Sequence, residues 1–277
     1  MNDRRRFVLA LGSVVIGAGL AVALASTRAA APESEQEAPD YISKLEAYSG
    51  HGEWVKYAGA GGDTVVAYIA FPERPDPAPA MIVIHEIFGM SDFIRTVTHD
   101  LAVQGYVAIA PDLLTRRGGT EGADDARTLI RDLPADSITV DLDATLAYLK
   151  SLDSVDDESF GVIGFCWGGS QTFRYATNQP GLKAAVVCYG GAPEAGAMAD
   201  IAAPVLGVYG ENDARINASL PEVEGAMASA GKSYEYEIYP GANHGFLRSR
   251  NVPDEADRAW ANIFAFLERT LNTCSRD

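Results

Sequence analysis

Cysteine and basic residues are scarce in this chain of 277 residues. It has three cysteines, Cys166, Cys188 and Cys274. An odd number of widely spaced cysteines forms neither a disulfide framework nor a zinc-binding pattern, so both kinds of site are excluded. Lysine and arginine total 22 against 38 aspartates and glutamates, which gives a formal net charge of −16. This deficit of positive charge argues against nucleic acid and anionic membrane surfaces as partners.

Internal repeats are also missing, and the composition does not change after residue 45. Apolar residues make up 47% of the chain and charged residues 22%, which is ordinary for a globular protein with a sizeable core. The length fits one α/β domain or two small ones. We therefore predict a single catalytic domain over residues 46–277.

The first 31 residues have the pattern of an export signal. Arg4-Arg5-Arg6-Phe7-Val8 precedes an uncharged apolar run over residues 9–25, and Ala29-Ala30-Ala31 offers small residues for cleavage. Because Arg-Arg-x-Phe-Val resembles a twin-arginine signal, we predict a periplasmic protein delivered by the export machinery. The alternative is a retained membrane anchor, since the apolar run is about the minimum length for a span. Residues 32–45 are acidic and contain prolines, which predicts a flexible linker.

Patterns of strand and helix alternate through the rest of the chain. Two segments rich in β-formers flank a glycine-rich loop and predict a hairpin over residues 53–71. The alternation predicts an α/β fold, a mostly parallel twisted sheet with helices on both faces. Further strands are expected over residues 80–85, 106–110, 159–164, 183–189, 204–209 and 233–239, and helices over 93–104, 123–132, 138–152, 170–178, 220–230 and 254–271.

The segment Gly164-Phe165-Cys166-Trp167-Gly168-Gly169 has the arrangement of a nucleophile elbow, with cysteine in place of the usual serine. Gly164 and Gly168 lack a Cβ atom, so neighbouring backbone can pass close to them. The thiol is expected at a helix N-terminus, where the helix dipole favours thiolate. Taken alone, the motif also fits a buried structural cysteine beside a glycine turn.

Three other chemically useful side chains lie just past the ends of predicted strands: Glu86, Asp213 and His244. The active site of such a sheet lies at these strand ends. The order Cys166, Asp213, His244 is that of an α/β-hydrolase triad. In such a triad the thiol attacks a carbonyl, the imidazole moves a proton, and the carboxylate orients the imidazole. Glu211 is an alternative to Asp213, and each of these residues could instead be an ordinary turn residue.

Backbone N–H groups should complete the site. We expect an oxyanion hole formed by the N–H of Trp167, the residue after the nucleophile, and the N–H of Ile87, in the loop after the strand at 80–85.

Five short motifs together resemble the dienelactone hydrolase family of the α/β-hydrolase superfamily. They are Gly-Phe-Cys-Trp-Gly-Gly, His-Glu-Ile-Phe-Gly, Pro-Asp-Leu, Gly-Glu-Asn-Asp and His-Gly-Phe, and the match covers most of residues 50–272. The resemblance implies a cofactor-free α/β-hydrolase with a Cys166, His244 and Asp213 triad. It also implies that Glu86 pairs with the resting thiol and helps to form thiolate when substrate arrives.

The same resemblance implies arginines that bind a substrate carboxylate. They match Arg116 and Arg248, although Arg117 competes with Arg116 and either could be a plain surface cation. A guanidinium can hold a carboxylate with two parallel hydrogen bonds.

The leading hypothesis from the sequence is a monomer that hydrolyses a small ester or lactone through an acyl-thioenzyme, without metal or cofactor. A noncatalytic small-ligand binding protein on the same scaffold is the alternative. A third hypothesis is a redox thiol in which Cys188 resolves oxidised Cys166, although the chain has no Cys-x-x-Cys motif.

Overall fold

The computed structural model describes residues 39–123 and 125–271. The predicted export signal, the first part of the predicted linker and Cys274 lie outside the described residues. Among the residues that are described, none of the helices is both long and apolar enough to cross a membrane.

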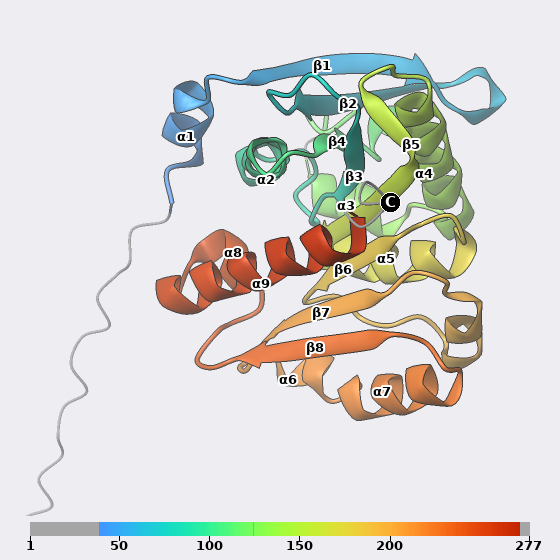
Figure 1. The fold of residues 1–277 in the computed structure, drawn as a ribbon, viewed down its shortest axis with the longest axis vertical. Helices are drawn as coiled ribbons and strands as arrows, with labels where there is room; N and C mark the ends of the chain where they lie inside the picture. The colour runs from blue at the N-terminus through green and yellow to red at the C-terminus, as the bar shows by residue number, and fades with distance from the viewer. Residues whose placement is uncertain (1–38, 124, 272–277) are drawn as a thin grey trace, which may run out of the picture. The chain divides into compact units, whose positions relative to one another are not determined.

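The described residues form one sheet of eight strands in the order β1-β2-β4-β3-β5-β6-β7-β8 (Figure 1). The pairs β1–β2 and β2–β4 are antiparallel, and all other pairs are parallel. The predicted hairpin and the mostly parallel sheet are thus confirmed. The strands are β1 (His51–Ala58), β2 (Thr64–Phe71), β3 (Ala78–Ile84), β4 (Val107–Pro111), β5 (Val155–Phe165), β6 (Ala184–Cys188), β7 (Val205–Gly210) and β8 (Tyr234–Tyr239).

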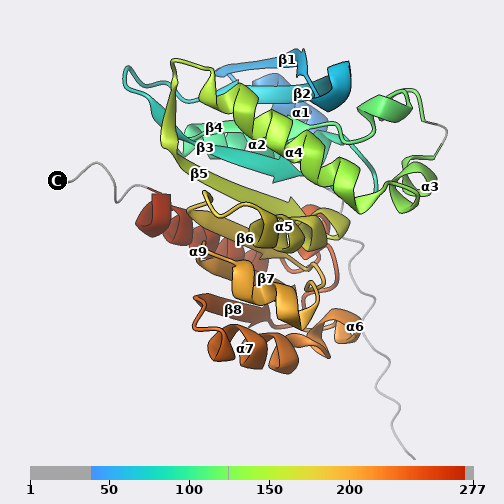
Figure 2. The ribbon, with the colours of Figure 1, turned by 90° about the vertical axis from the view of Figure 1, so that its right-hand side faces the viewer.

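Helices cover both faces of this sheet, as Figure 2 shows. One core cluster packs α4, α5 and α7 on one face, and a second packs α2 and α9 on the other. The helices are α1 (Tyr41–Ala47), α2 (Asp92–Val103), α3 (Ala126–Arg131), α4 (Ala135–Lys150), α5 (Trp167–Asn178), α6 (Ala214–Asn217), α7 (Leu220–Ser229), α8 (Phe246–Ser249) and α9 (Pro253–Leu271), with 3-10 turns at Ala60–Gly62, Thr115–Arg117 and Ala195–Asp200.

The central strands are the rigid part of the fold. Every residue of β3, β4, β6 and β7 is buried, as expected for parallel strands covered on both faces. Each fully buried valine or isoleucine side chain contributes about 1.5–3 kcal/mol to folding. The carboxyl ends of these strands are therefore held firmly, and the loops that leave them carry the predicted site residues.

One difference from the prediction lies at the start of the domain. Residues 41–45, expected in the flexible linker, form the first part of α1. The Asp40 carboxylate caps this helix by accepting the Ser43 N–H at 3.0 Å and the Ser43 hydroxyl at 2.6 Å. An aspartate at this position satisfies a backbone donor that the first helical turn leaves free. The short helices α6 and α8 were not predicted either.

Candidate active site

Cys166 lies between the end of β5 and the start of α5 in a strained backbone conformation. Its φ is 57° and its ψ is −117°, in a region that non-glycine residues rarely occupy. Its N–H donates to the Cys188 carbonyl at 3.0 Å, and its carbonyl accepts from the Ser170 N–H at 3.2 Å. Hydrogen bonds to β6 and to α5 therefore hold the elbow in this conformation.

The two glycines of the elbow are required by close backbone contacts. A Cβ atom on Gly164 would lie 2.2 Å from the Gly168 carbonyl oxygen. A Cβ atom on Gly168 would lie 2.3 Å from the carbonyl oxygen of Ile84, the last residue of β3. The elbow consequently packs directly on the strand end from which Glu86 projects.

His244 and Asp213 come together from the ends of the neighbouring strands β8 and β7. His244 Nδ1 lies 2.5 Å from Asp213 Oδ2, and the Asp213 side chain is 7% exposed. The rival carboxylate, Glu211, instead accepts the Gly241 N–H at 2.8 Å. With Nδ1 occupied by the carboxylate, Nε2 of His244 is the ring nitrogen that can exchange a proton with a substrate or nucleophile.

The surroundings of Cys166 favour the protonated thiol. Burial is the largest influence and raises the thiol pKa, and the negative charge of Glu86 raises it further. Hydrogen bonds from the N–H groups of Trp167 and Ile87 lower the pKa, as does the positive charge of Arg215. The helix N-terminus was expected to favour thiolate, but burial outweighs it here. Both N–H groups predicted for the oxyanion hole thus lie close enough to the sulfur to lower its pKa.

Glu86 is buried, and burial raises the pKa of its carboxyl to about 7, while Arg248 acts in the opposite direction. Glu86 Oε2 and Arg248 Nε lie 2.9 Å apart as an ion pair. The two atoms are not aligned for a hydrogen bond, since neither has such a partner among the described residues. The carboxyl is therefore able to gain or lose a proton near neutral pH.

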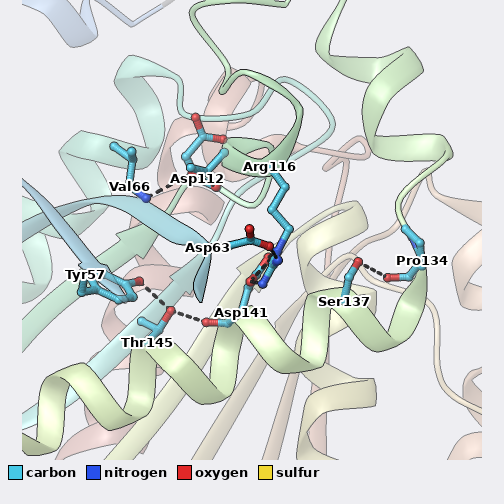
Figure 3. Close-up of polar contacts among 10 residues, drawn as sticks. Tyr57, Asp63, Val66, Asp112, Arg116, Pro134, Ser137, Asp141 and Thr145 are labelled. Carbon is cyan, nitrogen blue, oxygen red and sulfur yellow. Dashed lines mark hydrogen bonds and ion pairs between the residues drawn. The ribbon is translucent and has the colours of Figure 1, made fainter. Parts of the chain in front are cut away.

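The two arginines predicted to bind substrate lie in different surroundings. Arg248 contacts Glu86 at the site, and its guanidinium also lies 4.8 Å from the centroid of the Phe88 ring. Arg116 forms ion pairs with Asp63, just before β2, and with Asp141 on α4, and these contacts hold its guanidinium (Figure 3). The structure does not bring Arg116 into contact with any of the other predicted site residues.

Two residues near the site were missed by the sequence analysis. Tyr189, directly after β6, is fully buried with φ 41°, and its ring centroid is 5.2 Å from that of His244. Its hydroxyl has no hydrogen-bond partner among the described residues. Arg127, on α3, lies 4.9 Å from the centroid of the Phe88 ring that Arg248 also contacts. Tyr189 is the last residue of a predicted strand, a signal that could have been used, whereas Arg127 belongs to no motif.

The arrangement supplies a thiol, an oriented imidazole and two N–H donors, which is the equipment for nucleophilic attack on a carbonyl. Within residues 39–123 and 125–271, no group of three or more histidine, cysteine, aspartate or glutamate residues is arranged to hold a metal ion.

Comparison with known proteins gives a consistent result. The sequence model described as "Dienelactone hydrolase family" matches residues 65–271. A protein of Methylorubrum extorquens named "Putative carboxymethylenebutenolidase" is 35% identical over 197 residues, which are 66% of this chain and 68% of that protein. A protein of the same name from Escherichia coli K12 is 37% identical over 201 residues, which are 67% of this chain and 74% of that protein.

A solved structure shares the fold. The crystal structure titled "Putative Dienelactone Hydrolase", from Klebsiella pneumoniae, superposes with a TM-score of 0.72 at 31% sequence identity. The match covers 79% of this chain and 99% of that one. The predicted fold class, α/β-hydrolase, is thereby confirmed.

Proposed function

The chain belongs to the dienelactone hydrolase family, and from this premise we propose that it cleaves small carboxylic esters or lactones through Cys166, His244 and Asp213. Membership makes it a hydrolase; the cysteine mechanism and the substrate are the proposal. The observation that carries it is the 2.5 Å contact between His244 and Asp213, at the same edge of the sheet as the strained elbow of Cys166.

In the proposed reaction the Cys166 sulfur attacks the carbonyl carbon of the ester. The thiol gives up its proton, with His244 Nε2 as the base, and the N–H groups of Ile87 and Trp167 stabilise the negative oxygen that forms. The C–O bond to the leaving group then breaks, and the imidazolium returns the proton to the departing oxygen. Water, deprotonated by the same ring, attacks the acyl-thioenzyme and releases the acid and the free thiol.

Glu86 fits a role in activating the thiol. Its charge raises the pKa of Cys166, and its own carboxyl has a pKa of about 7. If substrate draws Arg248 away, the pKa of Glu86 rises further, because the cation that stabilises its negative charge is lost. Protonation of Glu86 removes the negative charge beside the sulfur, so the pKa of Cys166 falls and the thiol passes its proton to His244 more easily. The resting thiol, kept protonated, would resist oxidation in the exported location that we also propose.

The charges beside the site favour an ester that carries a carboxylate. Arg248 and Arg127 both lie within 5 Å of the centroid of the Phe88 ring, at 4.8 and 4.9 Å. Among the described residues no carboxylate forms an ion pair with Arg127, whereas Arg116 pairs with two. We therefore assign Arg127, in place of Arg116, as the second cation for the substrate anion.

The test is turnover by the Cys166→Ala variant of the mature protein, measured with activated 4-nitrophenyl esters and with dienelactone. We expect a loss of about 10⁴-fold or more in kcat, as in other enzymes that lose their nucleophile. Cys188→Ala is the matched control, since Cys188 is a buried strand thiol and its loss should spare most activity. Undiminished turnover by Cys166→Ala would contradict the mechanism, and saturable binding without turnover by the unmodified protein would indicate a binding protein.

A further inference from the structure

Helix α1 connects a part of the chain outside the family match to the active-site loop. It covers Tyr41–Ala47, whereas the family match begins at residue 65. The hydroxyl of Tyr41, the first residue of the helix, donates to the backbone carbonyl of Arg248 at 2.6 Å. This contact joins positions 207 residues apart in the sequence.

The carbonyl that Tyr41 binds belongs to a very short helix. Helix α8 has four residues, so its own hydrogen bonds leave carbonyls at its C-terminus without helical partners. Arg250 ends the helix in the left-handed conformation, with φ 51°, and its N–H donates to the Phe246 carbonyl at 2.8 Å. The Tyr41 hydroxyl supplies the partner for the Arg248 carbonyl. It thus caps the helix that holds the Arg248 side chain against Glu86.

The rest of α1 is only weakly attached. No residue of this helix is fully buried, and Leu45 is the one residue besides Tyr41 that is half-buried. A cavity of about 190 Å³ lies beside it, lined on the α1 side by Tyr41 and Lys44 and on the other side by residues of α2, α8 and α9. The Tyr41 ring reaches across to the Phe93 ring, edge to face, at a centroid distance of 5.4 Å. Burial raises the pKa of Tyr41 to about 12, so the hydroxyl keeps its proton and remains a donor.

We propose that Tyr41 is a positioning residue for Arg248. Its hydroxyl fixes the backbone of α8, so that the guanidinium stays close to Glu86 and to Phe88 and is ready for a substrate carboxylate. The inference rests on the proposed function in one respect, the binding of a substrate anion by Arg248. It adds that a helix preceding the matched family region sets the position of that arginine.

The experiment compares two activated esters with the full mature protein, neutral 4-nitrophenyl acetate and anionic mono-4-nitrophenyl glutarate. Tyr41→Phe removes the hydroxyl and keeps the ring packing. We expect KM for the anionic ester to rise about 3- to 10-fold, the range for one lost neutral hydrogen bond, with KM for the neutral ester and both kcat values nearly unchanged. A purely structural role would change both substrates alike.

Tyr48→Phe is the matched control. Tyr48 directly follows α1, and its ring stacks on His99 at a centroid distance of 3.6 Å. Tyr48→Phe therefore removes a tyrosine hydroxyl from the same region and leaves the hydrogen bond to α8 in place. Arg248→Gln is the reference, and we expect its KM for the anionic ester to rise at least tenfold more than its KM for the neutral ester. In that background Tyr41→Phe should add nothing.

The outcomes separate the two hypotheses. If Arg248→Gln discriminates between the esters and Tyr41→Phe behaves like Tyr48→Phe, the positioning role of Tyr41 is overturned and the proposed function stands. If Arg248→Gln does not discriminate, the anion-binding role of Arg248 is wrong and the inference drawn from it is overturned as well.

Discussion

Two buried carboxylates in this protein each face an arginine, and the two pairs differ in how fully they are hydrogen-bonded. Asp141 on α4 accepts three hydrogen bonds from Arg116. Its Oδ1 accepts from Nε at 3.0 Å and from Nη2 at 2.7 Å, and its Oδ2 accepts from Nε at 3.2 Å. Glu86 has one ion pair with Arg248 at 2.9 Å, and the two atoms lack hydrogen-bond alignment. The Asp141 pair is saturated, whereas the Glu86 pair is left incomplete.

The difference indicates which pair serves the fold and which serves the reaction. Arg116 links the loop before β2 to α4 through Asp63 and Asp141, and its own pKa is raised by the hydrogen bonds to Asp141 (Figure 3). Around Glu86, burial dominates and leaves a carboxyl with a pKa of about 7. A saturated pair resists change, while an incomplete pair can exchange a proton or a partner.

Replacing Glu86 with glutamine should produce the largest change in stability with pH. The carboxyl has a pKa of about 7 in the folded protein against an ordinary value of 4.5, so between these pH values the folded protein binds more protons than the unfolded chain. The stability of the unmodified protein should therefore fall as pH rises through this window, by about 3 kcal/mol relative to Glu86→Gln. Urea unfolding of both proteins from pH 4 to 8 measures this difference. Parallel stability curves would mean that Glu86 titrates normally.

The same variant tests the electrostatic link to the thiol. Because the charge of Glu86 raises the pKa of Cys166, Glu86→Gln should speed alkylation of Cys166 by iodoacetamide at pH 7–8 and increase inactivation by peroxide. A rate no greater than that of the unmodified protein would remove Glu86 from the control of the thiol.

Replacing Arg116 with glutamine should weaken the fold and spare the reaction. It leaves Asp141, whose side chain is 6% exposed, without its cation. The free energy of unfolding should fall by about 2–3 kcal/mol, which is at or below the lower limit of about 3–5 kcal/mol for a fully buried pair, because Arg116 itself is partly exposed. Thermal or urea unfolding gives this value, and KM for the anionic ester should stay within twofold.

Matched variants sharpen this prediction. Arg117→Gln changes a neighbouring arginine that donates to the Asp132 carbonyl at 2.7 Å on the surface, and it should cost under about 0.5 kcal/mol. Arg127→Gln should leave stability alone and raise KM for the anionic ester. A selective rise in KM with Arg116→Gln instead would restore the substrate role that the sequence assigned to Arg116.

Apart from the Arg117→Gln control, the smallest effect is expected of Tyr57→Phe, a change beside the Asp141–Arg116 pair. The Tyr57 hydroxyl lies 2.7 Å from Thr145 Oγ1, and Thr145 in turn donates to the Asp141 carbonyl at 2.7 Å. Loss of one such hydrogen bond costs about 1 kcal/mol. Unfolding should show this loss, and the kinetics with both esters should be unchanged. An effect on activity would mean that the Asp141 region is coupled to the site after all.

Much of the fold could be predicted because its signals are local. Continuous apolar runs such as residues 80–84 predict buried parallel strands, and the turn residues after them indicate where a site can lie. Glu86, Asp213 and His244 were selected as candidates in this way, since each lies within five residues of the end of a strand. The glycines of the elbow were also identified correctly, because their role depends on the lack of a Cβ atom.

The remaining features depend on contacts distant in sequence. Arg116 was expected at the site because it follows the Pro-Asp-Leu motif of the resemblance. No motif links it to its ion-pair partners Asp63 and Asp141, which are 53 and 25 residues away in the sequence. The positive φ of Tyr189 is a backbone property that no residue pattern reveals. The capping role of Asp40 was hidden by the acidic, proline-containing composition of the segment before it.

The outermost strand, β8, bears on how copies of this protein can meet. Glu235 and Glu237 alternate along it with tyrosines, and arginines of α9 bind both carboxylates: Arg269 pairs with Glu235, and Arg258 Nη2 lies 2.9 Å from Glu237 Oε1. If the β8 strand of a second copy paired with this edge strand, its glutamates would lie beside Glu235 and Glu237. It would also have to compete with the ion pairs that these two residues already form with α9. Growth of the sheet from molecule to molecule is thereby discouraged along the β8 side.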